Sequence, residues 1–198
     1  MVVPNNNKLQ IPFELILGSA SPRRKQLLEG LGLEFTVQAI DANESEWPVN
    51  LKAGEVPLFL AELKSKAYPR ELKENQVLIT SDTIVWCENQ VLNKPLDFED
   101  GKRMLTQLSG KMHEVFTAVC LRSSKKQNLF YERTAVYFKV LSEAEIEYYL
   151  NHYKPYDKAG AYGAQDWIGY VGIEKIEGSF YNVMGLPVLK LYESLREF

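Results

Sequence analysis

A strand, a turn of small residues and a helix start follow one another in residues 13–31, and this order constrains the fold more than any other stretch. Residues 13–17 form a short, branched apolar run of the kind found in buried strands. Ser21 stands where a helix N-cap belongs, and Pro22 stands where the first helical residue belongs. The leucines of residues 26–31 share one helical face. The pattern therefore predicts a buried strand that passes through a tight turn directly into a helix.

The predicted helix starts with three basic residues, Arg23, Arg24 and Lys25. A helix N-terminus presents free backbone N–H groups and the positive end of the helix dipole, so cations are unfavourable there. One interpretation is a solvated helix end, and the other is a turn that binds an anion. The formal net charge of −3 makes the basic cluster a local feature and argues against a general nucleic-acid binder. We therefore expect a polyphosphate to bind in this turn.

A single carboxylate, that of Asp82, lies within the largely apolar run of residues 76–87. A buried carboxylate is costly unless a cation pairs with it or it binds a metal. The alternative is an aspartate that caps a turn at a strand end. The acidic loop of residues 41–46 also has two interpretations, a solvated turn or a source of carboxylate ligands for a cation. These two segments are the candidates for the chemistry of the site.

Helices and strands follow one another along the rest of the chain. Apolar spacing and capping residues predict helices over residues 57–68, 97–108 (N-cap Asp97), 142–150 (a capping box of Ser142 and Glu145) and 188–198. Apolar or alternating runs predict strands over residues 33–39, 76–87, 114–122, 128–141 and 168–176, with a hairpin between the third and fourth. Residues 178–187 are interpreted as a turn-rich connector. The glycine-containing loop 157–165 matches neither a Walker loop nor a dinucleotide-binding fingerprint.

Composition narrows the class of protein. A chain of 198 residues with 45% hydrophobic residues can bury a sizeable core. Cys87 and Cys120 lie in apolar runs without a CxxC partner, which favours core packing in a reducing cytoplasm. Two histidines are too few for a His-rich zinc site, and no apolar run has the length of a membrane span. Residues 1–12 are predicted to be a disordered lead-in, and residues 13–198 a single domain.

Five segments together resemble the Maf family of nucleoside triphosphate pyrophosphatases, in the order and spacing of that family from about residue 13 onward. They are residues 17–24 (LGSASPRR), 81–85 with 92–95 (SDTIV and LNKP), 108–117 (LSGKMHEVFT), 157–165 (DKAGAYGAQ) and 182–187 (NVMGLP). The chain departs from the family pattern at Gly18, Ser65, Ser81 and Asn93. Three departures exchange one small residue for another. Asn93 stands where glycine is usual, and asparagine tolerates the left-handed conformation that a glycine would supply.

The resemblance implies an α/β fold with a long mixed β-sheet flanked by helices, like that of inosine triphosphate pyrophosphatases, with two lobes and a central cleft. It also implies hydrolysis of a nucleoside triphosphate to the monophosphate and pyrophosphate, with a divalent cation (Mg²⁺, Mn²⁺ or Co²⁺). Asp82 would be the general base. Ser19, Arg24, Lys64 and Lys94 would bind phosphate, while Glu44 and Asp82 would hold the metal. The family also implies a homodimer. The cysteine usage, the net charge and the lack of a membrane-length apolar run predict a cytoplasmic protein with no nucleic-acid or membrane partner.

The resemblance favours one branch of the family, which acts on dTTP and UTP and has Arg, Thr and Gln at three positions. This chain has Arg23, Thr83 and Gln165 there. A glutamine amide presents both a donor and an acceptor, which matches the imide edge of uracil or thymine. Two alternatives stay open: a pyrophosphatase for 7-methyl-GTP or other modified nucleotides, and a non-catalytic nucleotide-binding regulator of cell division.

Overall fold

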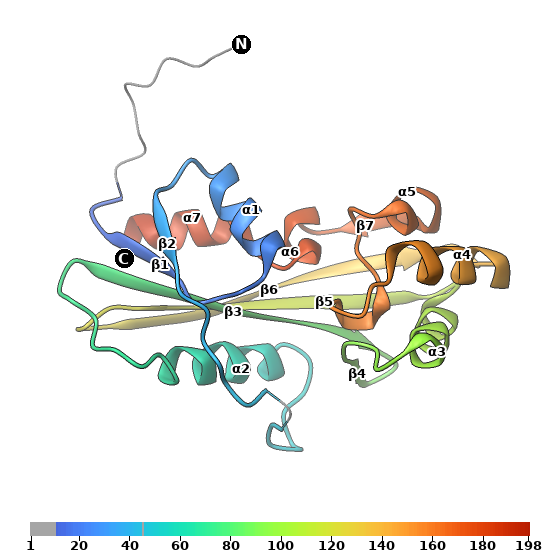
Figure 1. Cartoon of the computed structure of the whole chain (residues 1–198), viewed down its shortest axis with the longest axis horizontal. Coiled ribbons are helices and arrows are strands. Elements are labelled where there is room, and N and C mark those ends of the chain that lie inside the picture. The colour runs from blue at the N-terminus through green and yellow to red at the C-terminus, as the bar shows by residue number, and fades with distance from the viewer. Residues whose placement is uncertain (1–10, 45) are drawn as a thin grey trace, which may run out of the picture.

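The computed structural model describes residues 11–44 and 46–198, so the first ten residues of the expected lead-in lie outside the described part. One long sheet runs through the molecule, and helices cover both of its faces (Figure 1). Helices α1 (Pro22–Gly30), α6 (Phe180–Met184) and α7 (Val188–Glu197) lie on one face, and α2 (Glu55–Lys66) lies on the other. Helices α3 (Phe98–Leu108), α4 (Glu143–Tyr153) and α5 (Trp167–Gly172) gather at one end. A short 3₁₀ helix, η1, spans Ala159–Ala161.

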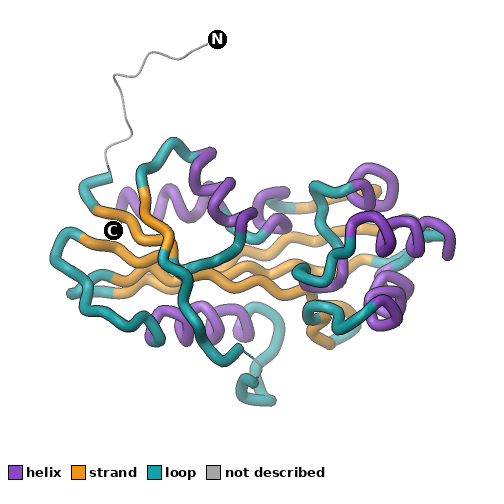
Figure 2. The backbone as a smooth tube through the Cα atoms, in the orientation of Figure 1, coloured by secondary structure: helices purple, strands orange, loops and turns teal. Residues whose placement is uncertain are grey.

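The sheet is mixed and, within residues 11–44 and 46–198, has seven strands (Figure 2). These are β1 (Glu14–Leu17), β2 (Phe35–Val37), β3 (Gln76–Cys87), β4 (Gln90–Leu92), β5 (Met112–Arg122), β6 (Gln127–Phe138) and β7 (Ile173–Glu177). The order is β2-β1-β3-β5-β6-β7, and β4 pairs with β3. Strands β1, β2 and β3 are parallel, while β3, β5, β6 and β7 are antiparallel neighbours. The α/β fold with a long mixed sheet is confirmed.

One edge of β3 is shared by two short strands. Strand β1 pairs with the first third of β3, up to Ile79, and β4 pairs with its last three residues, Val85–Cys87. Neither strand pairs with residues 80–84, whereas β5 follows the opposite edge from Leu78 to Trp86. The backbone N–H of Gly18 still forms a hydrogen bond to β3, and after Gly18 the chain turns away from that strand. The result is a gap in the sheet between two flanking units.

Each side of this gap has its own apolar core. One cluster joins β1, α1 and α7 through Leu17, Leu28 and Leu191. The other joins β4, α3, α4 and α5 and includes Leu105, Tyr149 and Ile168. These side chains are almost completely buried, so each cluster holds its own wall of the gap in place.

The helix signals in the sequence work as expected. Ser21 caps α1 by accepting a hydrogen bond from the Arg24 backbone N–H, and Pro22 is its first residue. Asp97 caps α3, and Ser142 with Glu145 forms the capping box of α4. The predicted hairpin is formed by β5 and β6. No helix in the described residues is both long and apolar enough to cross a membrane.

Two of the predicted elements are wrong, and the alternative interpretation of Asp82 is ruled out. The expected strand 168–176 is a helix, α5, followed by the strand β7. Gly169 lies within this helix, where a Cβ would lie 1.8 Å from the Ala164 carbonyl oxygen, so only glycine permits the close packing of α5 on that backbone. The connector 178–187 contains α6, which Ser179 caps. Asp82 does not end a strand, because β3 continues to Cys87.

His113 makes the stability of the fold depend on pH. It is 1% exposed and bonded to the Tyr162 hydroxyl, and burial lowers its pKa from 6.5 to about 3. Below pH 6.5 the unfolded chain therefore binds a proton that the folded protein does not accept. This contribution to stability is complete above pH 6.5 and is lost as the pH falls toward 3. We expect about 2 kcal/mol to be lost between pH 7 and pH 5.

Urea unfolding at both pH values measures this loss. His113→Gln removes the titrating group, so its stability should fall less on acidification than that of the parent. His152→Gln changes the exposed histidine and should keep the slope of the parent. Equal slopes for the parent and His113→Gln would contradict the assignment.

Candidate active site

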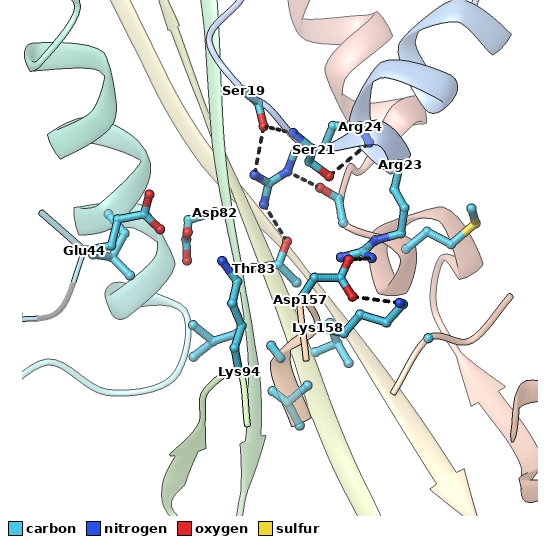
Figure 3. A pocket seen from close by; sticks show the side chains of 18 of the residues that line it. Ser19, Ser21, Arg23, Arg24, Glu44, Asp82, Thr83, Lys94, Asp157 and Lys158 are labelled. Atoms are coloured by element: carbon cyan, nitrogen blue, oxygen red, sulfur yellow. Dashed lines mark hydrogen bonds and ion pairs between the residues drawn. The ribbon is translucent and has the colours of Figure 1, made fainter. Parts of the chain in front are cut away.

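A cavity of about 730 Å³ lies at the gap in the sheet. Its walls come from the turn after β1, the loop near Glu44, the middle of β3, the Asn93–Lys94 segment, the 157–165 loop and the end of α6. Figure 3 shows Asp82, Lys94 and the two arginines around one space. All nine residues to which the resemblance gives a role in the site line this cavity: Ser19, Arg23, Arg24, Glu44, Lys64, Asp82, Thr83, Lys94 and Gln165.

The N-terminus of α1 opens onto this cavity. The Ser21 backbone N–H donates to Ser19 Oγ over 3.2 Å, and the Ser21 side chain accepts from the Arg24 N–H over 3.4 Å. The turn is therefore preorganised, with the positive end of the α1 dipole facing the cavity. Gly18 before it packs closely, because a Cβ there would lie 2.6 Å from Ile40 Cδ1 and the isoleucine side chain would have to shift. This geometry suits an anion.

Arg24 is held by three oxygen atoms. Its Nε donates to the Gly185 carbonyl over 3.0 Å, its Nη2 to Thr83 Oγ1 over 3.2 Å, and its Nη1 to Ser19 Oγ over 3.4 Å. Burial lowers the pKa of the Arg24 guanidinium, while the charge of Asp82 opposes that shift. The group still stays protonated, because arginine titrates far above neutral pH. A rigidly placed, partly desolvated cation thus lies beside the helix N-terminus.

Lys64 joins two carboxylates across the cavity. Its Nζ lies 2.6 Å from Asp82 Oδ1 and 3.0 Å from Glu44 Oε2, and it also donates to the Ser81 carbonyl over 3.4 Å. The side chains of Lys64 and Asp82 are 9% and 10% exposed, against 38% for Glu44. The cost of burying Asp82 is therefore offset by an ion pair with a lysine from α2.

The acidic loop contributes only part of what the sequence suggested. Glu44 reaches the cavity, whereas Asp41 is exposed and does not line it. Among the described residues no group of three or more His, Cys, Asp or Glu side chains converges on one point. Glu44 and Asp82 are the two carboxylates that meet at Lys64, and they are the candidates for holding a cation on this side of the cavity.

The 157–165 loop closes the cavity opposite β3. Asp157 accepts from Arg23 Nη1 over 2.8 Å and from Lys158 Nζ over 2.8 Å, which links the loop to α1. Gln165 lines the cavity with a buried Oε1 that has no hydrogen-bond partner in the described part of the chain. Nothing local in the sequence indicates that Asp157 belongs to the site, because its role depends on the contact with Arg23, which is 134 positions away.

Asn93 and Lys94 form the remaining wall. The Asn93 carbonyl accepts from the Gly160 N–H over 3.1 Å, so this segment is tied to the 157–165 loop. Asn93 is not among the described residues with positive φ, so the left-handed conformation considered for it is wrong. Lys94 is exposed and extends into the cavity (Figure 3).

Gly185 supports Arg24 through a backbone conformation that other residues rarely adopt. Its φ is 113°, and its carbonyl accepts from Arg24 Nε. We expect Gly185→Ala to destabilise the fold by about 1–3 kcal/mol through backbone strain. Urea unfolding measures the loss. Gly30→Ala is the matched control, because Gly30 lies in α1 and a Cβ there would meet nothing within 4 Å. It should stay within about 1 kcal/mol of the parent; equal losses would contradict the strain argument.

A mixed sheet with a gap, a helix N-terminus at the cavity, converging cations and a buried carboxylate define an α/β protein whose cavity suits an anionic ligand. The chain belongs to the Maf-like protein family, whose model matches residues 14–198. This membership confirms the resemblance carried by the five sequence segments.

Curated relatives span almost the same length. A dTTP/UTP pyrophosphatase of Flavobacterium johnsoniae is 49% identical over 183 residues, which cover 92% of this chain and 94% of the relative. One of Bacteroides fragilis is 47% identical over 185 residues, covering 93% and 96%. A solved HAM1 protein from Coxiella burnetii aligns with 64% of this chain and 73% of its own, at 11% identity and a TM-score of 0.41, which is too distant for any inference.

Proposed function

We propose that this chain hydrolyses dTTP and UTP to the monophosphate and pyrophosphate. The observation that carries the proposal is one cavity in which the α1 N-terminus, Arg24 and Lys94 face the buried carboxylate of Asp82. The cations and free N–H groups suit a triphosphate. The names of the relatives supply the substrate class.

In this proposal Asp82 takes the proton of the attacking water. Its carboxylate lies in the middle of β3, on a rigid central strand, and Lys64 holds one of its oxygens 2.6 Å away. The position of the carboxylate is therefore fixed before the substrate binds. Ser19, Arg24 and Lys94 bind the phosphate oxygens, and the charge on the departing pyrophosphate is met by the same cations.

A divalent cation fits the donors present. Mg²⁺ and Mn²⁺ prefer oxygen ligands, and Mg²⁺ commonly takes one or two carboxylates together with substrate phosphates. Glu44 and Asp82 already converge on one ammonium group, at 3.0 and 2.6 Å, so they can be ligands of one ion. When bound, the ion would lower the pKa of a water and neutralise phosphate oxygens.

We assign base recognition to Arg23, Thr83 and Gln165, which line the wall formed by α1, β3 and the 157–165 loop. Gln165 supports this assignment because its side chain lines the cavity, and an amide can both donate and accept a hydrogen bond. Arg23 is itself paired with Asp157, so its position depends on the loop.

A nucleotide panel with pyrophosphate detection tests the function. The panel holds dTTP, UTP, CTP, GTP and 7-methyl-GTP with Mg²⁺, Mn²⁺ or Co²⁺. We expect dTTP and UTP to be hydrolysed fastest, with pyrophosphate and monophosphate as products. A preference for 7-methyl-GTP would assign the chain to the other branch. Binding of UTP without turnover under any of the cations would favour a non-catalytic regulator.

Removal of the metal is a separate test. We expect EDTA to abolish hydrolysis by the native protein, and excess Mg²⁺ or Mn²⁺ to restore it. Full activity after exhaustive chelation would contradict the cation site at Glu44 and Asp82.

Two further predictions concern the oligomeric state and the location of the protein in the cell. A homodimer is tested by light scattering on the purified chain, and a cytoplasmic location by cell fractionation.

A further inference from the structure

All three donors of the Lys64 ammonium group are engaged. Its Nζ lies 2.6 Å from Asp82 Oδ1 and 3.0 Å from Glu44 Oε2, and it donates to the Ser81 carbonyl oxygen over 3.4 Å. An ammonium group has three N–H donors and no acceptor. The Lys64 side chain is 9% exposed and lines the cavity, but while these contacts last it has no donor for a ligand oxygen.

The ammonium group also stands where a divalent cation would have to bind. Such a cation binds carboxylate oxygens at about 2.0–2.6 Å, so an ion held by the two oxygens that contact Lys64 would lie within a few ångströms of Nζ. Two positive charges so close together in a nearly buried site repel each other strongly. Lys64 and the cation therefore compete for Glu44 and Asp82. Lys64 has the advantage in the free protein, because it belongs to the chain and cannot be diluted away.

A nucleoside triphosphate changes this balance. Its phosphate oxygens are anionic acceptors, and the flexible four-carbon stem of a lysine lets the ammonium group turn from one acceptor to another. Glu44 is 38% exposed and lines the cavity, so an entering cation can reach this carboxylate. Once Lys64 turns toward phosphate, Glu44 and Asp82 face each other without a counter-ion, and this favours the uptake of a cation.

We propose that Lys64 occupies the cation site of the free protein and leaves it for the phosphate groups when nucleotide and metal bind. The inference rests on the proposed function. The nucleotide draws Lys64 away from the carboxylates, and the cation frees the donors of Lys64 for phosphate. Nucleotide and cation therefore bind cooperatively, and each raises the affinity for the other by the same factor. Without a nucleotide the protein binds the cation weakly.

Calorimetry with Mn²⁺ and no nucleotide tests the first half of this exchange. Lys64→Met removes the competing charge, so it should bind Mn²⁺ about tenfold more tightly than the parent. Adding Glu44→Gln to Lys64→Met should abolish the gain, because one of the two ligands is then lost. Lys66→Met is the matched control, because its lysine lies in the same helix but pairs with Glu62, and it should bind Mn²⁺ like the parent. Lys64→Gln serves if methionine prevents folding.

Binding of a non-hydrolysable UTP analogue in EDTA tests the second half. Lys64→Met has lost a charged partner for phosphate, so it should bind the analogue about tenfold more weakly than the parent. The affinities for Mn²⁺ and for the nucleotide therefore change in opposite directions with one substitution. A purely structural role of Lys64 would weaken both or leave both unchanged.

An Mn²⁺ affinity of Lys64→Met that is equal to or lower than that of the parent would overturn the proposal. A gain that survives the addition of Glu44→Gln, or an unchanged affinity for the analogue, would also overturn it. If the parent binds the analogue but does not hydrolyse UTP, the proposed function fails, while opposite changes in the two affinities still establish the exchange at Lys64. The two failures are therefore distinguishable.

Discussion

Asp82→Asn is expected to lower turnover of dTTP and UTP at least ~10²-fold, the lower range for loss of a general base. Asparagine has nearly the size of aspartate but cannot take a proton from water. Asp82 lies in the middle of β3 with its carboxylate in the cavity, so the exchange removes the base without displacing the strand. Steady-state kinetics with pyrophosphate detection measures the loss, which should fall mainly on kcat.

A matched control separates this effect from a general loss of charge. Glu88→Gln also removes a carboxylate that is paired with a lysine, Lys111, at 2.8 Å, but on the surface and outside the cavity. It should hydrolyse UTP like the parent. Near-parent turnover by a folded Asp82→Asn protein would show that Asp82 is not the general base.

Lys64→Met is expected to destabilise the protein by about 3 kcal/mol, because it leaves two carboxylates facing each other without a counter-ion. The ammonium of Lys64 is nearly buried and lies between Asp82 and Glu44. Methionine keeps the length of the side chain, so the packing of α2 changes little. Urea unfolding at neutral pH measures the difference.

Lys66→Met is the control for Lys64→Met. It makes the same exchange two residues later in α2, where the lysine side chain is 64% exposed and pairs with Glu62 of the same helix. Such a surface pair contributes little, so we expect a loss within about 0.5 kcal/mol. Combining Lys64→Met with Asp82→Asn should recover part of the stability. Equal losses for the two single lysine variants would contradict a bridging role for Lys64.

The position of the site explains why a charged centre is tolerated inside a sheet. Residues 80–84 of β3 pair with neither β1 nor β4 at one edge, and residues 82–84 line the cavity there. Lys64 supplies a donor to the Ser81 carbonyl there. The gap therefore opens the cavity to a ligand. It also leaves polar groups of β3 without a neighbouring strand, so other elements must supply their hydrogen-bond partners.

Local signals were enough for the elements whose ends depend on near neighbours. Ser21, Pro22 and Asp97 mark helix starts because a cap bonds within three residues of itself. Asp82 was recognisable because a carboxylate in a buried strand needs an explanation. Local signals failed at α5, where β-branched and aromatic residues favour a strand but Gly169 packs on the Ala164 carbonyl. Tertiary packing overrides such propensities.

The sequence by itself determined the strand–turn–helix at residues 14–30, the β5–β6 hairpin and the family to which the chain belongs. Only the tertiary structure decided that Lys64 lies between Glu44 and Asp82 and that Asp157 pairs with Arg23. The reason is distance along the chain. Caps and periodicity act over a few residues, whereas these contacts join positions 18 to 134 residues apart and exist only after the sheet has formed.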